Sequence, residues 1–256
     1  MNLGDLGAPL AVGNTAKVYL FENKIIKVFN DNLPYTESMN EANRQEYAYS
    51  CGLYVPKVLD VIKLEEDKQA IVMEYIKGET IGNLLSDNPE QAEYYMNISI
   101  DLQRKVHQNE ADSIDLMSEK LSRQINSAPY LGNELKSSLL DKLGSMVFEK
   151  RLCHGDFHLF NLIKSDDKVA IIDWVDASAG DLRADIYRTY LLYSQLSMDL
   201  ADMYLHLYCK KSGLSKGEIL KWAPIIAAAR LSECVITERP ERLLDIVNDY
   251  PATEVE

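Results

Sequence analysis

The sequence predicts an α+β fold in which a small β-rich lobe comes first and a larger, mainly helical lobe follows. Three observations support this prediction. Short apolar runs bounded by turns fill the chain up to Lys77, and long stretches with helical spacing fill most of the remainder. One loop rich in polar residues, 154–161, interrupts the helical part. We therefore expect two domains, 1–77 and 78–256, and a composition of 46% hydrophobic residues allows a large core.

The first lobe is expected to contain a sheet of about five strands with one helix inserted after the third. Glu22 and Asn23 form the predicted turn between the first two clear strands, and an acidic turn at 65–67 separates the last two. The predicted strands are 17–21, 24–29, 55–62 and 69–76.

Helices are predicted from apolar spacing and from capping patterns. Ser38 to Glu41 has the form of a capping box and opens a helix that runs to about Cys51, with Gly52 as its stop. Ser215 to Glu218 offers a second capping box. Helical patterns in the second lobe lie near 90–109, 116–126, 133–149, 181–211 and 216–236, and a hairpin is expected at 161–164 and 169–172.

The charge of the chain excludes some partners and favours others. The net charge of −13 argues against a nucleic-acid partner. Up to Lys77 there are eight basic and eleven acidic residues, and the rest of the chain holds 19 basic and 29 acidic residues. This more acidic second part would attract a cationic substrate, although on charge alone an acidic soluble surface is the favoured explanation. No apolar stretch is long and uncharged enough for a membrane span, and four scattered cysteines indicate a reducing, cytoplasmic environment.

One segment carries more chemistry than any other. His154-Gly-Asp-Phe-His-Leu-Phe-Asn161 is followed by an apolar run that ends in Asp173 and a tryptophan. Asp156 could accept or orient the proton of an attacking hydroxyl, and Asn161 and Asp173 offer the oxygen ligands that Mg²⁺ prefers against nucleotide phosphates. The order carboxylate, amide, carboxylate therefore indicates phosphoryl transfer.

Two other chemistries fit the same segment less well. His154, Asp156 and His158 alternate as zinc ligands on a strand would, but the chain has only two further histidines and no Cys-x-x-Cys. An aspartyl-phosphate phosphatase requires Asp-x-Asp after an apolar strand, whereas two residues separate Asp173 from Asp176. A solvated loop with no chemistry would also contain these residue types.

These residues resemble the aminoglycoside phosphotransferase and choline kinase family, whose members share the bilobal, protein-kinase-like fold. The spacing from Asp156 to Asn161 to Asp173 is similar to that of the kinase catalytic loop and its metal-binding aspartate. The resemblance covers about residues 10–185. It implies ATP, or GTP, as the phosphoryl donor, Mg²⁺ on Asn161 and Asp173, and Asp156 as the residue that orients the acceptor hydroxyl. Leu159 and Phe160 depart from the Pro-Gly that many relatives have there.

Lys27 is the expected phosphate-binding lysine of the first lobe. It interrupts an apolar strand, and alternation places it on one face with Ile25 and Phe29. A lysine bound to phosphate needs an acidic partner, for which the following helix offers Glu41 and Glu46. We expect Glu46, because an acidic residue in the first turn already has a capping role. A strand lysine whose amine simply reaches solvent is the alternative.

Other nucleotide-binding residues are implied by the resemblance alone. The turn with Asn14 and Thr15 would cover the phosphates, and Ile25 would lie over the adenine. The segment from Glu74 to Ile76 would be the hinge whose backbone binds the adenine edge.

The acceptor is expected to be a small molecule with a hydroxyl group, and its charge to be positive. An aminoglycoside, choline or another amino alcohol would meet both conditions. His158 could contact the acceptor, and its ammonium groups could be bound by acidic residues after Ile186 such as Glu233, Glu238, Glu241 and Asp245. Gly180 and Asp185 resemble the family's Gly-Asp-x-x-x-Asp, whose last aspartate braces the catalytic loop, and His107 is expected to be structural. The sequence does not determine the oligomeric state.

The sequence therefore predicts a small-molecule kinase. A non-catalytic nucleotide-binding module and a protein serine/threonine kinase are the two alternatives. The first has no need of Lys27, Asp156, Asn161 and Asp173 together, and the second has little room for a peptide-binding segment after Asp173.

Overall fold

A computed structural model describes residues 3–13, 15–31, 33–34, 36–64 and 68–249. The chain divides into two compact units. Unit 1 is Met1–Asn88 with Leu159–Asp176, and unit 2 is Pro89–His158 with Ala177–Glu256. The division differs from the expected boundary after Lys77, because the hairpin that follows Asn161 pairs with a short strand of the first unit.

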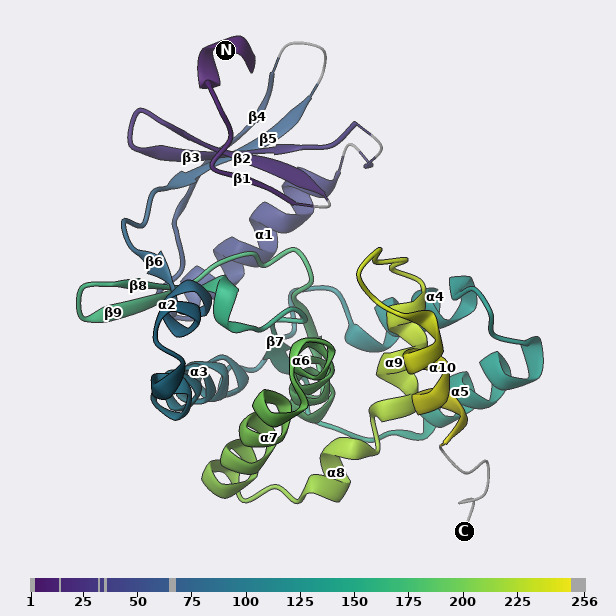
Figure 1. Ribbon diagram of the computed structural model, residues 1–256. Helices are drawn as coiled ribbons and strands as arrows, with labels where there is room; N and C mark the ends of the chain where they lie inside the picture. The colour runs from purple at the N-terminus through teal and green to yellow at the C-terminus, as the bar shows by residue number, and fades with distance from the viewer. Residues whose placement is uncertain (1–2, 14, 32, 35, 65–67, 250–256) are drawn as a thin grey trace. The chain divides into compact units, whose positions relative to one another are not determined.

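A five-stranded sheet forms the main part of unit 1 (Figure 1). Its order is β1-β2-β3-β5-β4, with every neighbour antiparallel. Glu22 and Asn23 have φ angles of 47° and 59°, which the tight turn of a two-residue hairpin requires. The predicted strands and this turn are confirmed. The strands are β1 (Ala11–Val12), β2 (Ala16–Phe21), β3 (Lys24–Phe29), β4 (Val58–Lys63) and β5 (Gln69–Glu74).

One helix, α1 (Glu37–Ser50), connects β3 to β4 and packs on one face of this sheet (Figure 1). Its Ala42 lies in a buried cluster with Phe29 and Met73. The inserted helix is confirmed, but the predicted capping box is wrong. Thr36 is the N-cap residue, and Ser38 is buried within the first turn, where its N–H donates to Gln69 Oε1 at 2.9 Å.

The opposite face of the sheet has its own core. Tyr19, Ile26 and Val28 pack there with Leu6, which ends a short 3₁₀ helix, η1 (Leu3–Leu6). Because Ile26 and Val28 occupy this face, Ile25, Lys27 and Phe29 lie on the face that α1 covers. The predicted turn at 65–67 lies outside the described residues.

The remainder of unit 1 contains the hairpin that follows Asn161. The predicted hairpin is confirmed, and Asp166 at its turn has a φ of 47°. A helix, α2, was not predicted, and Thr80 caps it by accepting a hydrogen bond from the N–H of Asn83 at 3.2 Å. These elements are β6 (Glu79–Thr80), α2 (Ile81–Asp87), η4 (Leu159–Asn161), β8 (Leu162–Ser165) and β9 (Lys168–Ile171), with the strand order β6-β8-β9.

Unit 2 is mainly helical and carries one short antiparallel ribbon of β7 and β10. The stretch expected as one helix at 181–211 is two helices, because Ser197 adopts an extended backbone and caps the second. The capping box at Ser215 and Glu218 is confirmed, and the helix after Arg239 was not predicted. The elements are η3 (Pro89–Gln91), α3 (Ala92–His107), α4 (Met117–Ser127), α5 (Asn133–Ser145), β7 (Arg151–Cys153), β10 (Ser178–Gly180), α6 (Leu182–Leu196), α7 (Met198–Ser212), α8 (Lys216–Leu220), α9 (Ala223–Leu231) and α10 (Pro240–Asn248).

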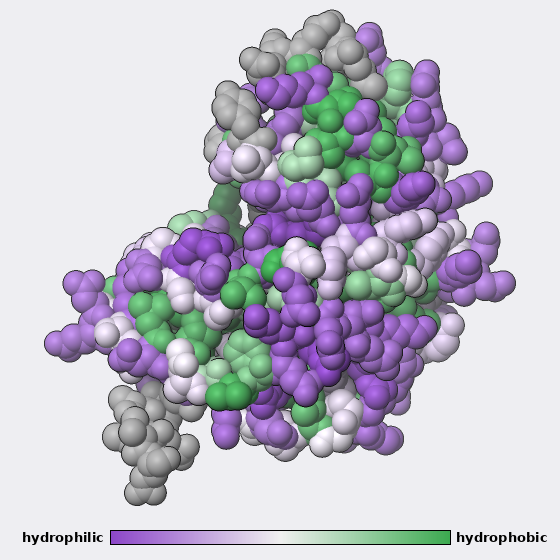
Figure 2. Space-filling view, turned by 180° about the vertical axis from the view of Figure 1, so that it is seen from behind, coloured by the Kyte–Doolittle hydropathy of each residue, from purple (hydrophilic) through white to green (hydrophobic). Residues whose placement is uncertain are grey.

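The predicted α+β class is confirmed by this division into a sheet-containing unit and a helical unit. Figure 2 shows one face of the molecule, where hydrophobic patches lie among a mainly hydrophilic surface. Within the described residues, no helix combines the length and the apolar character that a membrane crossing requires.

Candidate active site

Lys27 is at the centre of a buried charge cluster in unit 1. It lies in the middle of β3 and is only 8% exposed, although its Nζ carries a charge. The Nζ lies 2.6 Å from Glu41 Oε1 and 2.8 Å from Asp173 Oδ1. Burial acts to lower the pKa of Lys27, but the charges of Asp173 and Glu41 outweigh it and raise the pKa above the ordinary lysine value. Lys27 is therefore a cation at neutral pH.

The partner of Lys27 on α1 is Glu41, not Glu46, which corrects the sequence-based preference. The buried side of α1 is formed by Ser38, Glu41, Ala42, Gln45 and Ala48. Glu46 is exposed, because five residues separate it from Glu41 and turn it to the opposite side of the helix. Burial raises the pKa of Glu41 to about 7 even though Lys27 acts to lower it.

Asp173 and Asn161 come from adjacent segments of unit 1. The N–H of Ile172 donates to the carbonyl of Asn161 at 3.0 Å, and Trp174 is buried behind them. Asp173 has a φ of 64°, so the chain turns sharply where the carboxylate emerges. The Asp173 side chain is 38% exposed. Its carboxylate and the Asn161 amide oxygen are both hard oxygen donors, the ligand type that Mg²⁺ takes together with phosphate oxygens.

The remaining nucleotide-side candidates all belong to unit 1. Ile25 is partly buried against the α1-side core, and Ile76 is buried just after β5. Glu74 is the last residue of β5, and its N–H donates to the carbonyl of Lys57 at 2.9 Å. The carbonyl of Thr15 accepts from Asn30 N–H at 2.9 Å. Asn14 lies outside the described residues.

The predicted catalytic loop begins directly after β7 in unit 2. Gly155 has a φ of 81°, a conformation that favours glycine, and the Asp156 N–H donates to His154 Nδ1 at 3.3 Å. His158 Nε2 lies 3.3 Å from Asp156 Oδ2. Burial pushes the pKa of Asp156 upward, but the hydrogen bond and charge of His158, with the charge of Arg188, hold that pKa below its usual range. Asp156 is therefore an anion at neutral pH.

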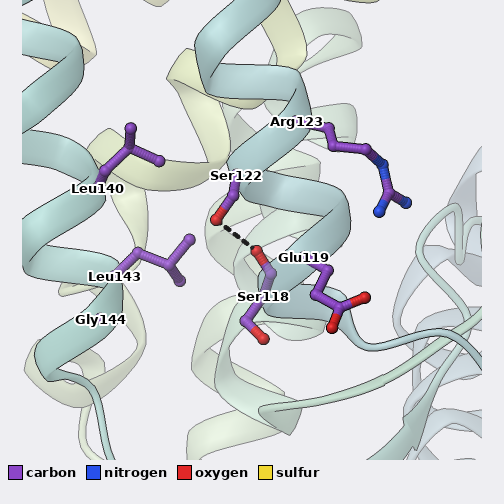
Figure 3. A pocket seen from close by; sticks show the side chains of 7 residues that line it. All are labelled: Ser118, Glu119, Ser122, Arg123, Leu140, Leu143 and Gly144. Carbon is purple, nitrogen blue, oxygen red and sulfur yellow. Dashed lines mark hydrogen bonds between the residues drawn. The ribbon is translucent and has the colours of Figure 1, made fainter.

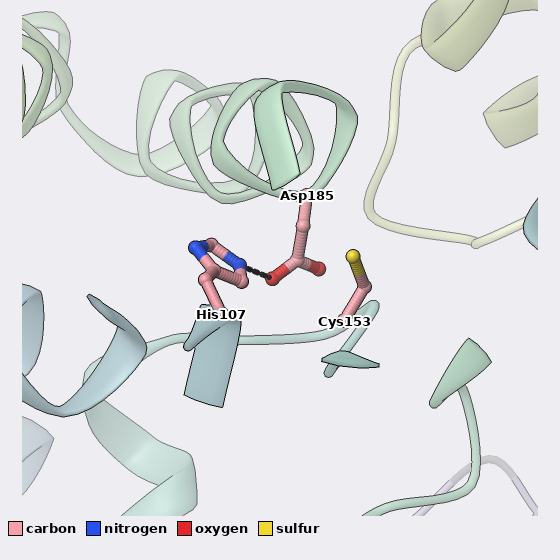
Figure 4. A group of neighbouring side chains, drawn as sticks. All are labelled: His107, Cys153 and Asp185. Carbon is pink, nitrogen blue, oxygen red and sulfur yellow. Dashed lines mark hydrogen bonds and ion pairs between the residues drawn. The ribbon is translucent and has the colours of Figure 1, made fainter. Parts of the chain in front are cut away.

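A second buried cluster fixes this loop. Asp185 Oδ1 accepts the N–H of Gly155 at 2.7 Å, so Asp185 holds the loop that contains Asp156. The Nε2–H of His107 donates to Asp185 Oδ2 at 2.8 Å, and His107 Nδ1 lies 2.8 Å from the Tyr208 hydroxyl. Figure 4 shows Cys153 beside His107 and Asp185. The atoms of these three side chains that could bind a metal lie within 4.8 Å of one another.

This cluster of His107, Cys153 and Asp185 does not have the properties of a metal site. Both ring nitrogens of His107 already have partners, and so do both oxygens of Asp185. Burial raises the pKa of the Cys153 thiol well above its usual value, which disfavours the thiolate that a metal needs. The cluster is structural, as expected for His107.

Glu233 and Glu238 are ion-paired with arginines of unit 2. Glu233 pairs with Arg230 and lies 2.9 Å from Arg188. Glu238 is only 8% exposed and lies 3.0 Å from Arg242 Nε. The structure therefore does not present either carboxylate as the unpaired anion expected for binding an ammonium group.

A pocket of about 450 Å³ opens between α4 and α5 (Figure 3). Ser122 Oγ, which donates to the Ser118 carbonyl at 2.8 Å, lies on its wall. The other lining residues are Glu119, Arg123, Leu140, Leu143 and Gly144, so none of the predicted site residues takes part.

The structure brings some predicted residues together and adds others. Lys27 meets Asp173, and Asp156 meets His158. Arg188 was not predicted, and neither was the choice of Glu41. The helical periodicity of α1 could have indicated Glu41, since it shares a face with the apolar residue Ala42. No signal in the sequence indicates Arg188.

Comparisons with solved structures show the fold. A thermostable mutant of aminoglycoside phosphotransferase APH(4)-Ia, in a ternary complex with ADP and hygromycin B, has a TM-score of 0.66 at 12% identity, covering 96% of this chain and 92% of that chain. A choline/ethanolamine kinase family protein from Mesorhizobium loti has a TM-score of 0.61 at 14% identity, covering 95% and 87%. Amicoumacin kinase hAmiN, in complex with AMP-PNP, Ca²⁺ and Ami, has a TM-score of 0.64 at 14% identity, covering 100% and 92%.

Comparison with family models gives a match to most of the chain. No curated protein matches it. The model described as the phosphotransferase enzyme family matches residues 7–220, which include Lys27, Glu41, Asp156, Asn161 and Asp173. The chain therefore belongs to the phosphotransferase enzyme family.

Proposed function

We propose that the protein transfers the γ-phosphoryl group of ATP to a hydroxyl of a small cationic molecule such as an aminoglycoside or an amino alcohol. The observation that carries this proposal is the ion-pair arrangement of Lys27 with Glu41 and Asp173. A buried lysine between two carboxylates, one of them partly exposed, is suited to bind phosphate beside a divalent cation. The family match supports the same reaction class.

In the proposed reaction Lys27 binds the phosphates of ATP, and Glu41 keeps the lysine side chain in place. Asn161 and Asp173 would hold Mg²⁺, which supplies positive charge to neutralise the phosphate oxygens. The similar structures crystallised with ADP or AMP-PNP support an adenine nucleotide as donor. These adenine nucleotides favour ATP over GTP as the donor, and we propose ATP.

Asp156 is the proposed residue that orients the acceptor hydroxyl. Its carboxylate is anionic at neutral pH, because the lowered pKa keeps it ionised. It can therefore accept a hydrogen bond from the hydroxyl as the oxygen approaches phosphorus. Since the transition state of phosphoryl transfer is loose, this residue works by positioning and needs no raised pKa. His158, at 3.3 Å from Asp156, fixes the carboxylate on one side.

The positive charge of the acceptor is proposed from the acidic surface of the chain after Lys77. Glu233 and Glu238 are neutralised by arginines, so they are poor candidates for ammonium ligands. Glu241 and Asp245 remain, four residues apart on α10 and both exposed. The similar structures include proteins described as aminoglycoside phosphotransferases and as a choline/ethanolamine kinase family protein, which favours cationic acceptors.

A coupled assay of ADP release tests the proposal. Purified protein with Mg-ATP is offered aminoglycosides, amino alcohols, neutral sugars and a generic protein substrate, with Asp156→Asn in parallel. We expect one class of cationic small molecule to stimulate ADP release, and the variant to show no stimulation. Phosphorylation of the protein substrate alone would contradict the proposed acceptor class. Mg-ATP binding without stimulation by any compound would favour the non-catalytic module.

A further inference from the structure

The catalytic loop is clamped at a single residue by two side chains of α6. Asp185 Oδ1 accepts the N–H of Gly155 at 2.7 Å, and Arg188 Nε donates to the carbonyl of the same residue at 3.2 Å. Asp185 and Arg188 are three residues apart on α6, so their side chains share one face of the helix. The N–H and the carbonyl of Gly155, the residue before Asp156, are therefore both held by side chains of α6.

Arg188 is itself held by a carboxylate from a distant part of unit 2. Arg188 is only 7% exposed, and its Nη2 donates to Glu233 Oε2 at 2.9 Å. Glu233 lies just after α9, in the segment 232–239 that leads to α10. Arg230 also pairs with Glu233, and Gln124 of α4 donates to its Oε1 at 3.5 Å. Glu233 thus has contacts that fix its position.

The charge of Arg188 reaches the catalytic carboxylate. Arg188 is among the groups that hold the pKa of Asp156 below its usual range. A buried guanidinium without a carboxylate partner is costly, so the loss of Glu233 would draw Arg188 toward the nearby negative charge of Asp156. That movement would remove the hydrogen bond to Gly155 and occupy the carboxylate that the acceptor hydroxyl needs.

We propose that Glu233 is a positioning residue, which keeps the Arg188 guanidinium on the Gly155 carbonyl and away from the Asp156 carboxylate. The proposal assigns Glu233 a role through Arg188 instead of direct binding of an acceptor ammonium group. Its catalytic consequence rests on the proposed function, whereas its structural content does not.

The structural content can be measured without turnover. The chain has three Gly-Asp pairs, Gly4-Asp5, Gly155-Asp156 and Gly180-Asp181. Protein labelled with carbonyl-¹³C glycine and ¹⁵N aspartate therefore gives three signals in an NMR experiment that correlates each aspartate amide with the preceding carbonyl. A Gly155→Ala variant identifies the Gly155 signal by its loss.

We expect Glu233→Gln to shift the Gly155 carbonyl signal and to leave the other two signals unchanged. Glu238→Gln is the matched control, because it removes a carboxylate from Arg230 and Arg242 but not from Arg188. It should leave all three signals in place. An unshifted Gly155 signal in Glu233→Gln, or an equal shift in Glu238→Gln, would overturn the proposal.

Kinetics then test the role in the proposed reaction. With an acceptor from the panel, we expect Glu233→Gln to lower kcat by about tenfold or more at unchanged KM for Mg-ATP and for the acceptor, the effect of a misplaced group. In an Arg188→Gln background the same substitution should add no further loss, because Glu233 acts through Arg188. Glu233→Asp, which retains the charge, should recover part of kcat.

The opposite kinetic pattern decides against the positioning role. A raised acceptor KM at unchanged kcat would make Glu233 an ammonium ligand, and multiplicative losses in the double variant would make the two residues independent. If no compound in the panel is phosphorylated, the proposed function fails while the NMR result still decides the Glu233–Arg188–Gly155 arrangement.

Discussion

Two buried charge clusters, that of Lys27 in unit 1 and that of Asp185 in unit 2, differ in how completely their polar atoms are paired. In unit 1, Lys27 faces two carboxylates, Asp173 is 38% exposed, and Glu41 Oε2 has no hydrogen-bond partner among the described residues. In unit 2, Asp185 is 1% exposed and accepts hydrogen bonds at both oxygens, from Gly155 and His107.

This difference separates a cluster that can bind a ligand from one that can only maintain a conformation. The unit 1 cluster has two carboxyl groups against one ammonium group, and Asp173 is partly exposed, so a divalent cation and phosphates can join it. In the unit 2 cluster each oxygen of Asp185 and each ring nitrogen of His107 already has a partner, and both side chains are buried. We infer that the first takes part in chemistry and the second fixes the loop that does.

Lys27→Met, in the unit 1 cluster, is the substitution with the largest expected effect. We expect turnover to fall by about a hundred- to a thousandfold, because the charge that neutralises phosphate is lost. Stability should fall as well, since Glu41 is left as a buried and unpaired carboxylate. Chemical denaturation and steady-state kinetics measure the two effects.

A second substitution separates these effects. Lys27→Met combined with Glu41→Gln should recover most of the stability and none of the turnover, because the buried negative charge is gone but the phosphate ligand is still missing. Recovery of turnover in the double variant would contradict the proposed role of Lys27.

In unit 2, Asp185→Asn should mainly lower the stability of the protein, because Asp185 fixes a loop and does not contact the reacting groups. We expect the free energy of unfolding to fall by about 2–3 kcal/mol, the value for hydrogen bonds to a charged group that lose their acceptor. Urea denaturation at pH 7 measures the loss, and Asp101→Asn, which breaks an exposed ion pair with Lys211, serves as the control. An equal loss in the control would contradict the structural role.

The pH dependence of this loss has a definite sign. Burial raises the pKa of Asp185, but the hydrogen bond and charge of His107 and the Gly155 N–H together hold the pKa below its ordinary value. The folded protein therefore binds the Asp185 proton less readily than the unfolded chain. The stabilisation is present above the ordinary aspartate pKa and is lost as pH falls through the folded pKa. The gap between wild type and Asp185→Asn should narrow below about pH 4.

Glu41→Gln and Glu46→Gln test which glutamate of α1 is the partner of Lys27. Glu41→Gln should lower kcat/KM for Mg-ATP by about tenfold, because the lysine loses the charge that orients it. Glu46→Gln should behave as wild type, since Glu46 is exposed on the other side of the helix. Equal effects of the two substitutions would contradict the assignment of Glu41.

The smallest expected effect concerns the acceptor. Neutralising Glu241 and Asp245 together should raise the KM of a cationic acceptor by about two- to threefold, because exposed charges are well screened. The effect should vanish at high salt and be absent for a neutral acceptor. An unchanged KM at low salt would remove α10 from the acceptor surface.

The sequence predicts most of the sheet unit and the order of the site residues. The strands of unit 1 follow from alternation and turn residues, as at Glu22 and Asn23, because these signals are local. The hairpin after Asn161 and the helix cap at Ser215 are predictable for the same reason. Asp185 could be assigned from the Gly-Asp-x-x-x-Asp motif that this chain shares with a known family.

The remaining features depend on contacts that no local pattern encodes. Ser197 divides a continuous helical pattern because its side chain accepts the Leu200 N–H at 3.3 Å, and the sequence permits either outcome. Arg188 and Glu233 are 45 residues apart in the chain and meet only in the folded unit. The sequence therefore gives no sign that Glu233 has a partner, whereas in the structure it is ion-paired with Arg188 and Arg230.

The central claim, that Asp156 orients the acceptor and Asp173 belongs to the nucleotide site, is tested most directly by comparing Asp156→Asn with Asp173→Asn. Mg-ATP affinity is measured by calorimetry and turnover by ADP release with the active acceptor. We predict that Asp156→Asn retains the affinity and loses at least about a hundredfold in turnover. Asp173→Asn should lose both. Near-normal turnover in Asp156→Asn, or undiminished Mg-ATP affinity in Asp173→Asn, would contradict the account.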